Sequence, residues 1–265
     1  MEEDIIIENI NNNIPFLLAR YNDGEFIAIT QWDYIYNCHC SMSPGNIDSH
    51  KYDKELGDVL REAILSDENV QLSKENKYLF QSKLSHYKNM LGNTFGLNVS
   101  SLDNIKFNVN TITKDFTDFI YSNPQKFIEC INLLNNKYIV LIGPEYLKYI
   151  SFLNVKQHII IPQVNCFSDK DNIIKNIVNE MNRRGSGGGG GTINNEHKYF
   201  IFCASMTTNY IIEKLKYLAL NKHTMIDMGS CFDNFISTSK VTSINRRVYK
   251  PEYIKQNYPS NYWIE

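Results

Sequence analysis

The sequence predicts an α/β fold: a Rossmann-like, doubly wound and mainly parallel sheet with helices on both faces. Three observations predict it. Short, continuously apolar segments such as 138–143 and 199–203 are typical of strands that are buried on both faces. Segments with the periodicity of amphipathic helices stand between them. The apolar segments end at Gly, Pro or Asp, which are residues that form turns. A parallel sheet covered on both sides accommodates this alternation.

The predicted elements alternate along most of the chain. Pro124 follows Asn123 and suits the first turn of a helix, whereas Leu56, Val59 and Leu60 lie on one face of another helix. Helices are expected at 2–11, 53–65, 79–91, from 123 onward, and at 170–181 and 209–220, and strands at 16–20, 138–144, 158–162, 199–205 and 224–229, with a helix or buried turn at 26–30.

Composition narrows the classes of function. The 265 residues carry a net charge of −2, so no overall basic field would attract nucleic acid. No apolar run approaches the roughly 18 residues that span a bilayer, and the acidic N-terminus lacks the positive region of a secretory signal. Six scattered cysteines favour free thiols in a reducing compartment. We therefore expect a cytoplasmic protein with no nucleic-acid partner and no membrane span.

One segment does not look natural. Residues 185–191 read Gly-Ser-Gly-Gly-Gly-Gly-Gly, which resembles an engineered flexible linker that replaces a loop. A short linker can join only ends that lie near each other, so we expect both ends at the surface. Apart from this linker, which carries no functional argument, we expect residues 1–265 to form a single domain.

An acidic turn directly follows the first predicted strand. Asp23 and Glu25 flank Gly24, and Arg20 ends the strand. Two carboxylates at the carboxyl end of a strand can hold a hard divalent cation such as Mg²⁺ or Mn²⁺. Arg20 can pair with a carboxylate or a phosphate. We expect both carboxylates to be exposed in a crevice, although an ordinary Asp-Gly turn remains an alternative.

Three further turns offer candidate residues. Asp227 ends a strand and would share the crevice with Asp23 and Glu25. There it could bind a metal ion or a ribose hydroxyl, act as a base, or simply cap the loop. Ser205 lies between a strand and a helix and could bind a phosphate or cap the helix. Gly143 occupies a similar turn. The chain lacks the glycine-rich dinucleotide motif, the Walker sequence and the Gly-x-Ser-x-Gly elbow, and the ligands in Cys38-His39-Cys40 are too close together for a zinc finger.

The segment Arg20–Glu25 resembles the Arg-Phe-Gly-Asp-Gly-Glu signature of the GT-D-type glycosyltransferases, a group built on a domain of formerly unknown function. The resemblance continues through 52–65, 138–144, 200–205 and 225–229, and through 161–167, which is similar to a Pro-x-x-Asn-Ala-Phe element. It covers most of residues 14–236. Two departures stand out: Asn22 replaces a glycine, and the stretch from Asp227 to Asp233 lacks a histidine and has one extra residue.

The resemblance implies metal-dependent transfer of a sugar from a nucleotide-diphosphate donor, expected to be a UDP-sugar, to a glycan or a protein-linked saccharide. Mn²⁺ or Mg²⁺ and the donor diphosphate would lie at Asp23 and Glu25, with Arg20 in electrostatic support. The nucleotide-sugar crevice would be lined by Gly143, Asn165, Ser205, Asp227 and Asp233. A methyltransferase and a non-catalytic binding module remain alternatives. The tyrosine-rich stretch 246–263 would either cover the acceptor cleft or pack as a C-terminal segment.

Overall fold

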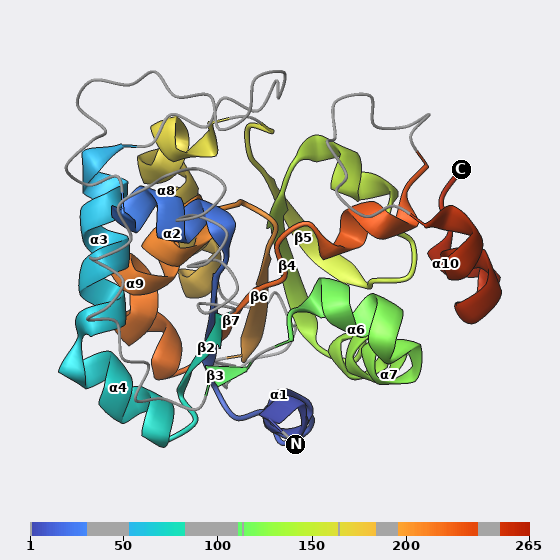
Figure 1. Ribbon diagram of the computed structural model, residues 1–265, viewed down its shortest axis with the longest axis horizontal. Helices are drawn as coiled ribbons and strands as arrows, with labels where there is room; N and C mark the ends of the chain where they lie inside the picture. The colour runs from blue at the N-terminus through green and yellow to red at the C-terminus, as the bar shows by residue number, and fades with distance from the viewer. Residues whose placement is uncertain are drawn as a thin grey trace, which may run out of the picture.

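One parallel sheet organises the chain (Figure 1). The computed structural model describes residues 2–30, 53–82, 111–112, 114–163, 165–183, 196–237 and 250–265. Its seven strands lie in the order β3-β2-β1-β7-β6-β4-β5, and neighbouring strands all pair in parallel. The strands are β1 (Leu17–Tyr21), β2 (Tyr78–Ser82), β3 (Thr111–Ile112), β4 (Tyr138–Gly143), β5 (Val155–Ile160), β6 (Lys198–Phe202) and β7 (Thr224–Asp227). The predicted α/β class is confirmed.

Helices cover both faces of the sheet, each over its own hydrophobic core. On one face lie α2 (Asp23–Thr30), α3 (Lys54–Leu65), α4 (Asp67–Lys74), α8 (Lys170–Asn182) and α9 (Thr207–Leu220). On the other lie α1 (Glu2–Asn11), α6 (Phe116–Ser122), α7 (Pro124–Leu134) and α10 (Pro251–Asn257), with the short 3₁₀ segments η3 (Glu145–Tyr149), η5 (Cys231–Phe235) and η6 (Ser260–Tyr262). A further 3₁₀ segment, η4 (Cys166–Asp169), leads into α8.

Local capping explains why two helices begin where the sequence predicts. The Asp53 side chain accepts a hydrogen bond from the Glu55 N–H at 2.8 Å and caps α3. Asn123 caps α7 through the Lys126 N–H, and Pro124 occupies the first helical position. Both signals lie within a few residues of the helix start, so the sequence alone displays them.

The helix expected at 79–91 is wrong in its first part. Residues Tyr78–Ser82 form β2, which pairs with β1 on one side and β3 on the other. Every residue of β2 is buried, and the run Tyr78-Leu79-Phe80 supplies apolar side chains to both cores. A strand covered on both faces needs such an unbroken apolar run, whereas an amphipathic helix does not. The rest of that expected helix lies outside the described residues.

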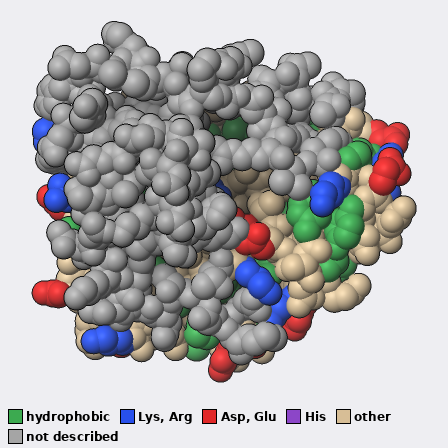
Figure 2. All heavy atoms as spheres, in the orientation of Figure 1, with side chains coloured by type: hydrophobic (Ala, Val, Ile, Leu, Met, Phe, Trp, Pro, Cys, Tyr) green, Lys and Arg blue, Asp and Glu red, His purple; other side chains and the backbone are tan. Residues whose placement is uncertain are grey.

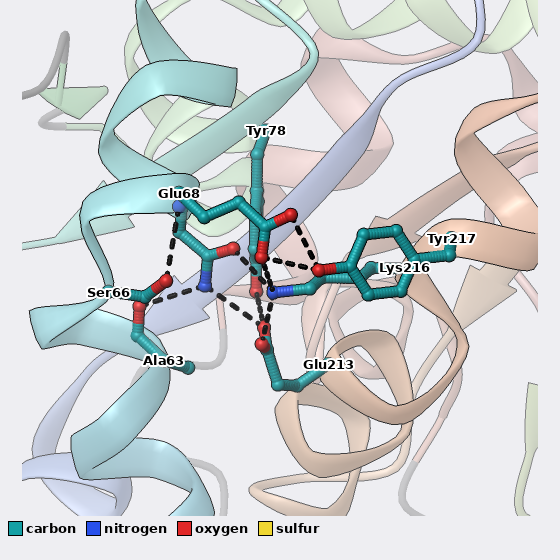
Figure 3. A network of polar contacts seen from close by, with 8 residues as sticks. Ala63, Ser66, Glu68, Tyr78, Glu213, Lys216 and Tyr217 are labelled. Carbon is teal, nitrogen blue, oxygen red and sulfur yellow. Dashed lines mark hydrogen bonds and ion pairs between the residues drawn. The ribbon is translucent and has the colours of Figure 1, made fainter.

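A buried polar network joins α4 to α9 (Figure 3). The Lys216 ammonium contacts Glu213 at 2.6 Å, Asn69 Oδ1 at 2.9 Å and Glu68 at 3.2 Å. The Asn69 amide in turn donates to the Ala63 carbonyl at 2.9 Å. Because the Lys216 side chain is only 6% exposed, its charge needs these partners, and they fix the position of α9.

The C-terminal segment packs against the second core, as one of the two interpretations of 246–263 held. Tyr258 and Tyr262 lie against Phe235, with ring centroids 5.0 and 5.8 Å apart. Residues 246–249 lie outside the described part of the chain, as do Cys38-His39-Cys40 and the linker at 185–191.

The described surface shows mixed charge. In Figure 2, acidic and basic side chains are interspersed over the described part of the visible face. Within the described residues, no helix is both long enough and apolar enough to cross a membrane.

Candidate functional site

The ion pair between Arg20 and Asp227 marks the centre of the candidate site. β1 and β7 are neighbours, and their carboxyl ends bring Arg20 Nε to 3.7 Å from Asp227 Oδ1. The Asp227 side chain is fully buried, whereas that of Arg20 is 16% exposed. After β1 the chain turns to α2 on one face, and after β7 it turns to η5 on the other. A crevice forms where the segments that follow two neighbouring strands leave to opposite faces of the sheet, and α/β proteins bind ligands there.

Gly229 allows the Arg20 guanidinium to lie directly against the backbone that follows β7. Its φ angle is +55°, and a Cβ atom at this position would come within 2.3 Å of Arg20 Cζ and Nη2. The Gly229 N–H also donates to Asp227 Oδ1 at 2.8 Å, which fixes that carboxylate. A residue with a side chain here would face both an unfavourable backbone conformation and a collision with the guanidinium.

Glu25 does not lie where the sequence predicted. It is buried, with 3% exposed, and its Oε2 accepts a hydrogen bond from the Asn22 N–H at 2.9 Å. Asn22 precedes the first residue of α2, so Glu25 reaches back to cap its own helix, as the acidic residue of a capping box does. The expectation of an exposed carboxylate is therefore wrong for Glu25. Asp23 is the first residue of α2, and its side chain lies outside the described part of the structure.

The two buried carboxylates hold protons more tightly than usual. Burial raises the pKa of Glu25 to about 7; the Arg20 charge opposes that rise and the Asp227 charge adds to it. Burial likewise raises the pKa of Asp227 to about 6, against the opposing charge of Arg20 and the Gly229 hydrogen bond. The three groups therefore interact electrostatically, and perturbed carboxylates in a crevice are typical of functional sites.

Sequence reasoning missed Asn209, which holds the backbone of Arg20. From the first turn of α9, its amide nitrogen donates to the Arg20 carbonyl at 2.6 Å, and its oxygen accepts from the Arg20 N–H at 3.3 Å. Asn209 is fully buried. Its position just after Ser205 in a strand-to-helix turn was visible in the sequence, but its partner 189 residues away was not.

Asn22 and Asp115 complete the polar surroundings of Arg20. With its amide oriented so that both polar atoms have partners, Asn22 accepts from Arg20 Nη1 at 2.8 Å. In the opposite orientation its nitrogen lies 3.4 Å from Asp115 Oδ2. Asp115 caps α6 and is 8% exposed, and its charge adds to the raised pKa of Asp227. No local pattern points to Asp115, because the strand before it has only two residues.

Asn165 and Ser205 meet at a second part of the same sheet edge. Both have left-handed backbone conformations, with φ angles of 51° and 53°. Together with Leu56, Met206 and others they line a hollow of about 10 Å³, which has room for about one water molecule. Met206 also lies beside α2, since its side chain would be 3.2 Å from a Cβ added at Gly24. The residue that follows Ser205 therefore contacts α2 at Gly24, whereas the role of Asn165 and Ser205 in a nucleotide-sugar crevice stays a prediction.

Gly143 and Asp233 have clear local contacts. A Cβ at Gly143 would lie 2.5 Å from Leu147 Cδ1, so the glycine permits close packing of η3 against β4. Asp233 is buried and accepts a hydrogen bond from the Tyr146 hydroxyl at 2.9 Å. Burial raises the pKa of the Cys203 thiol, and the charges of Asp233 and Asp227 raise it further.

Two solved structures resemble this chain. One is a selenomethionine-substituted structure of domain of unknown function 1792, with 13% identity, a TM-score of 0.52, and coverage of 100% of this chain and 95% of that one. The other represents the same domain, described as highly conserved and as having a distinct glycosyltransferase fold, with 14% identity, a TM-score of 0.54, and coverage of 100% and 88%. The chain has this glycosyltransferase fold. No protein-family model and no curated protein matches the sequence.

The carboxyl edge of the sheet offers oxygen atoms that suit a divalent cation. Asp227 Oδ2 is buried and has no hydrogen-bond partner among the described residues, so it is an oxygen that a cation or a ligand proton could satisfy. The described residues contain no group of three or more His, Cys, Asp or Glu side chains arranged to hold a metal ion. The donor set is hard and anionic, which suits Mg²⁺ or Mn²⁺ when further oxygens come from a ligand.

Proposed function

We propose that the protein is a metal-dependent glycosyltransferase that uses a nucleotide-diphosphate sugar, with UDP-sugars as the expected donors. The observation that carries the proposal is the Arg20–Asp227 pair beside buried Glu25, at the point where β1 and β7 diverge. The fold shared with a domain described as a glycosyltransferase fold supports it. The expected acceptor, a glycan or a protein-linked saccharide, rests on the resemblance of Arg20–Glu25 to the GT-D signature.

In this proposal each residue has a chemical role. Asp23 and Glu25 would hold Mn²⁺ or Mg²⁺ together with the donor diphosphate, and Asp227 would add an oxygen through Oδ2. When bound, the cation would neutralise charge that develops on the departing nucleoside diphosphate. Arg20 would stabilise the same charge, held in place by Asn209 and Asn22. Asn165 and Ser205, and on the other side Gly143 and Asp233, would border the nucleotide-sugar crevice.

A thermal-shift screen tests donor binding. UDP-glucose, UDP-galactose, UDP-N-acetylglucosamine and GDP-mannose would each be added with and without Mn²⁺, because a ligand that binds only the folded state raises the melting temperature. We expect a metal-dependent shift for one donor, lost in Asp227→Asn and retained in Asp67→Asn, a matched change on the exposed start of α4. A shift that survives in Asp227→Asn would contradict the assigned site. No shift with any donor would contradict the proposed function.

A further inference from the structure

Buried polar atoms without partners gather at one end of the sheet. Among the described residues, the atoms without a hydrogen bond include the Tyr21 hydroxyl, both amide atoms of Gln81, the Ser82 hydroxyl and Asp227 Oδ2. All four residues lie at the carboxyl ends of β1, β2 or β7. Buried polar groups in folded proteins nearly always have partners, so such a concentration indicates a place where a ligand supplies them.

Gln81 is the member of this group that lies opposite Arg20 on the neighbouring strand β2. It is 2% exposed, and β1 and β2 pair so that Arg20 is directly opposite Gln81. Opposed residues on neighbouring strands project to the same side of the sheet, about 4.8 Å apart. Tyr21 and Ser82, the next pair, project to the other side, where Tyr21 packs against Phe26 and Phe80. The Gln81 side chain therefore leaves the sheet on the same face as that of Arg20, one strand away, while the guanidinium lies over Gly229 on the β7 side.

The chemistry of a side-chain amide limits what it can recognise. Its oxygen accepts and its nitrogen donates, and the two atoms lie side by side. Two adjacent hydroxyl groups of a sugar match this pattern, because each hydroxyl can donate or accept. In a nucleotide sugar, the diphosphate joins two sugar rings, the ribose and the sugar that is transferred, and the base lies beyond the ribose. A group next to the diphosphate-binding Arg20 would thus meet a sugar ring and not the base, and only the transferred sugar is missing from UDP.

We propose that the Gln81 amide binds hydroxyl groups of the sugar that is transferred, and so takes part in donor selection. The inference deepens the proposed function and depends on it. It assigns a role to a residue that neither the motifs nor the cation site involve. It also gives a role to a buried glutamine that directly follows the three core residues Tyr78–Phe80 in β2.

The test compares binding of the whole donor with binding of its nucleotide part. Isothermal titration calorimetry with Mn²⁺ would measure dissociation constants of wild type, Gln81→Met and Gln71→Met for the UDP-sugar that wild type binds best, and for UDP. Gln71 lies exposed on α4 and provides the same chemical change away from the site. We expect Gln81→Met to weaken binding of the UDP-sugar roughly tenfold and to leave UDP binding within about twofold, with Gln71→Met unchanged for both.

The outcomes separate the inference from the proposed function. Equal weakening for UDP and UDP-sugar, or no weakening for either, would overturn the role of Gln81 while leaving the transferase proposal intact. Failure of wild type to bind both compounds would overturn the proposed function and the inference with it. The melting temperature without ligand is a second readout: it should not fall in Gln81→Met, because methionine removes polar atoms that have no partner. A large fall would assign the amide to the fold instead.

Discussion

At the scale of single residues, the site depends on close contacts that specific side chains make with Gly229 and with the start of α2. Arg20 lies over a glycine that has no side chain to obstruct it, and that same glycine holds Asp227 through its N–H. Glu25 combines a structural contact, the cap of α2, with a charge that Arg20 and Asp227 influence. Capping explains its burial, so a change to alanine there would weaken the helix as well as the site.

The methyl group that Gly229→Ala adds should destabilise the fold and displace the Arg20 guanidinium. The alanine would have to adopt a left-handed φ of +55° and would push the Arg20 guanidinium away. We expect the free energy of unfolding to fall by about 2 kcal/mol, with loss of donor binding. Urea unfolding would measure the first quantity and calorimetry the second. Gly24→Ala is the matched control, since its Cβ would meet only the flexible end of Met206, at 3.2 Å. Equal stability of the two variants would contradict this account.

At the scale of elements, α9 positions the end of β1. Two hydrogen bonds from Asn209 replace the ladder partners that Arg20 would otherwise need from a neighbouring strand. α9 is in turn fixed at its other end by the Lys216 network with α4. The helix therefore connects a buried charged cluster to the functional edge of the sheet.

Asn209→Ala tests how much the end of α9 that contacts β1 contributes to stability. It would leave the N–H and carbonyl groups of Arg20 without their partner, at a cost of about 1–3 kcal/mol of unfolding free energy. Guanidinium-induced unfolding would measure this loss. Asn221→Ala, at the exposed end of the same helix, should cost much less, because its amide donates to the Tyr217 carbonyl from a solvent-exposed position. A similar loss in both variants would show that the contact with β1 contributes nothing special.

The sequence predicted those elements whose signals are local. The apolar runs at 138–143 and 199–202 became β4 and β6, and Asp53 and Asn123 start the helices that they were expected to start. β2 was mistaken for a helix because Gln81 and Ser82 end its apolar run with polar residues, whose burial only the folded sheet reveals. The hydrogen bonds between Asn209 and Arg20, and the effect of the Asp115 charge on Asp227, join distant parts of the chain, and no local pattern encodes them.

At the scale of the whole molecule, the two ends of the sheet carry different kinds of titratable group. The carboxyl end gathers the candidate site, whereas the amino ends of β6 and β7 hold two buried or half-buried histidines. His223 Nδ1 accepts a hydrogen bond from the Lys198 N–H at 3.2 Å, and His197 Nε2 lies 2.8 Å from the Thr224 hydroxyl. Burial lowers the pKa of each histidine to about 4, so both are neutral at pH 7 in the folded state.

These histidines should make the fold sensitive to acid. Their pKa in the unfolded chain is near 6.5, so below that pH the unfolded state binds protons that the folded state does not. The histidine contribution to the free energy of unfolding should therefore fall as the pH drops from 6.5 towards 4, whereas the raised pKa values of Glu25 and Asp227 act in the opposite sense over the same range. Chemical denaturation of wild type and of His223→Asn, which keeps an acceptor for the Lys198 N–H, would isolate this contribution. The stability of wild type relative to His223→Asn should fall between pH 6.5 and 4, and a difference that does not change with pH would contradict the assignment.

The most direct test of the central claim is release of nucleoside diphosphate from the donor that the thermal screen identifies. The account predicts Mn²⁺-dependent release by wild type and by the surface variant Asp67→Asn, and a loss of at least roughly a hundredfold in Asp227→Asn and Glu25→Gln, which keep the shape of each side chain but remove its charge. Donor binding without any release by wild type, or undiminished release by Asp227→Asn, would contradict the claim that this edge of the sheet is a catalytic site.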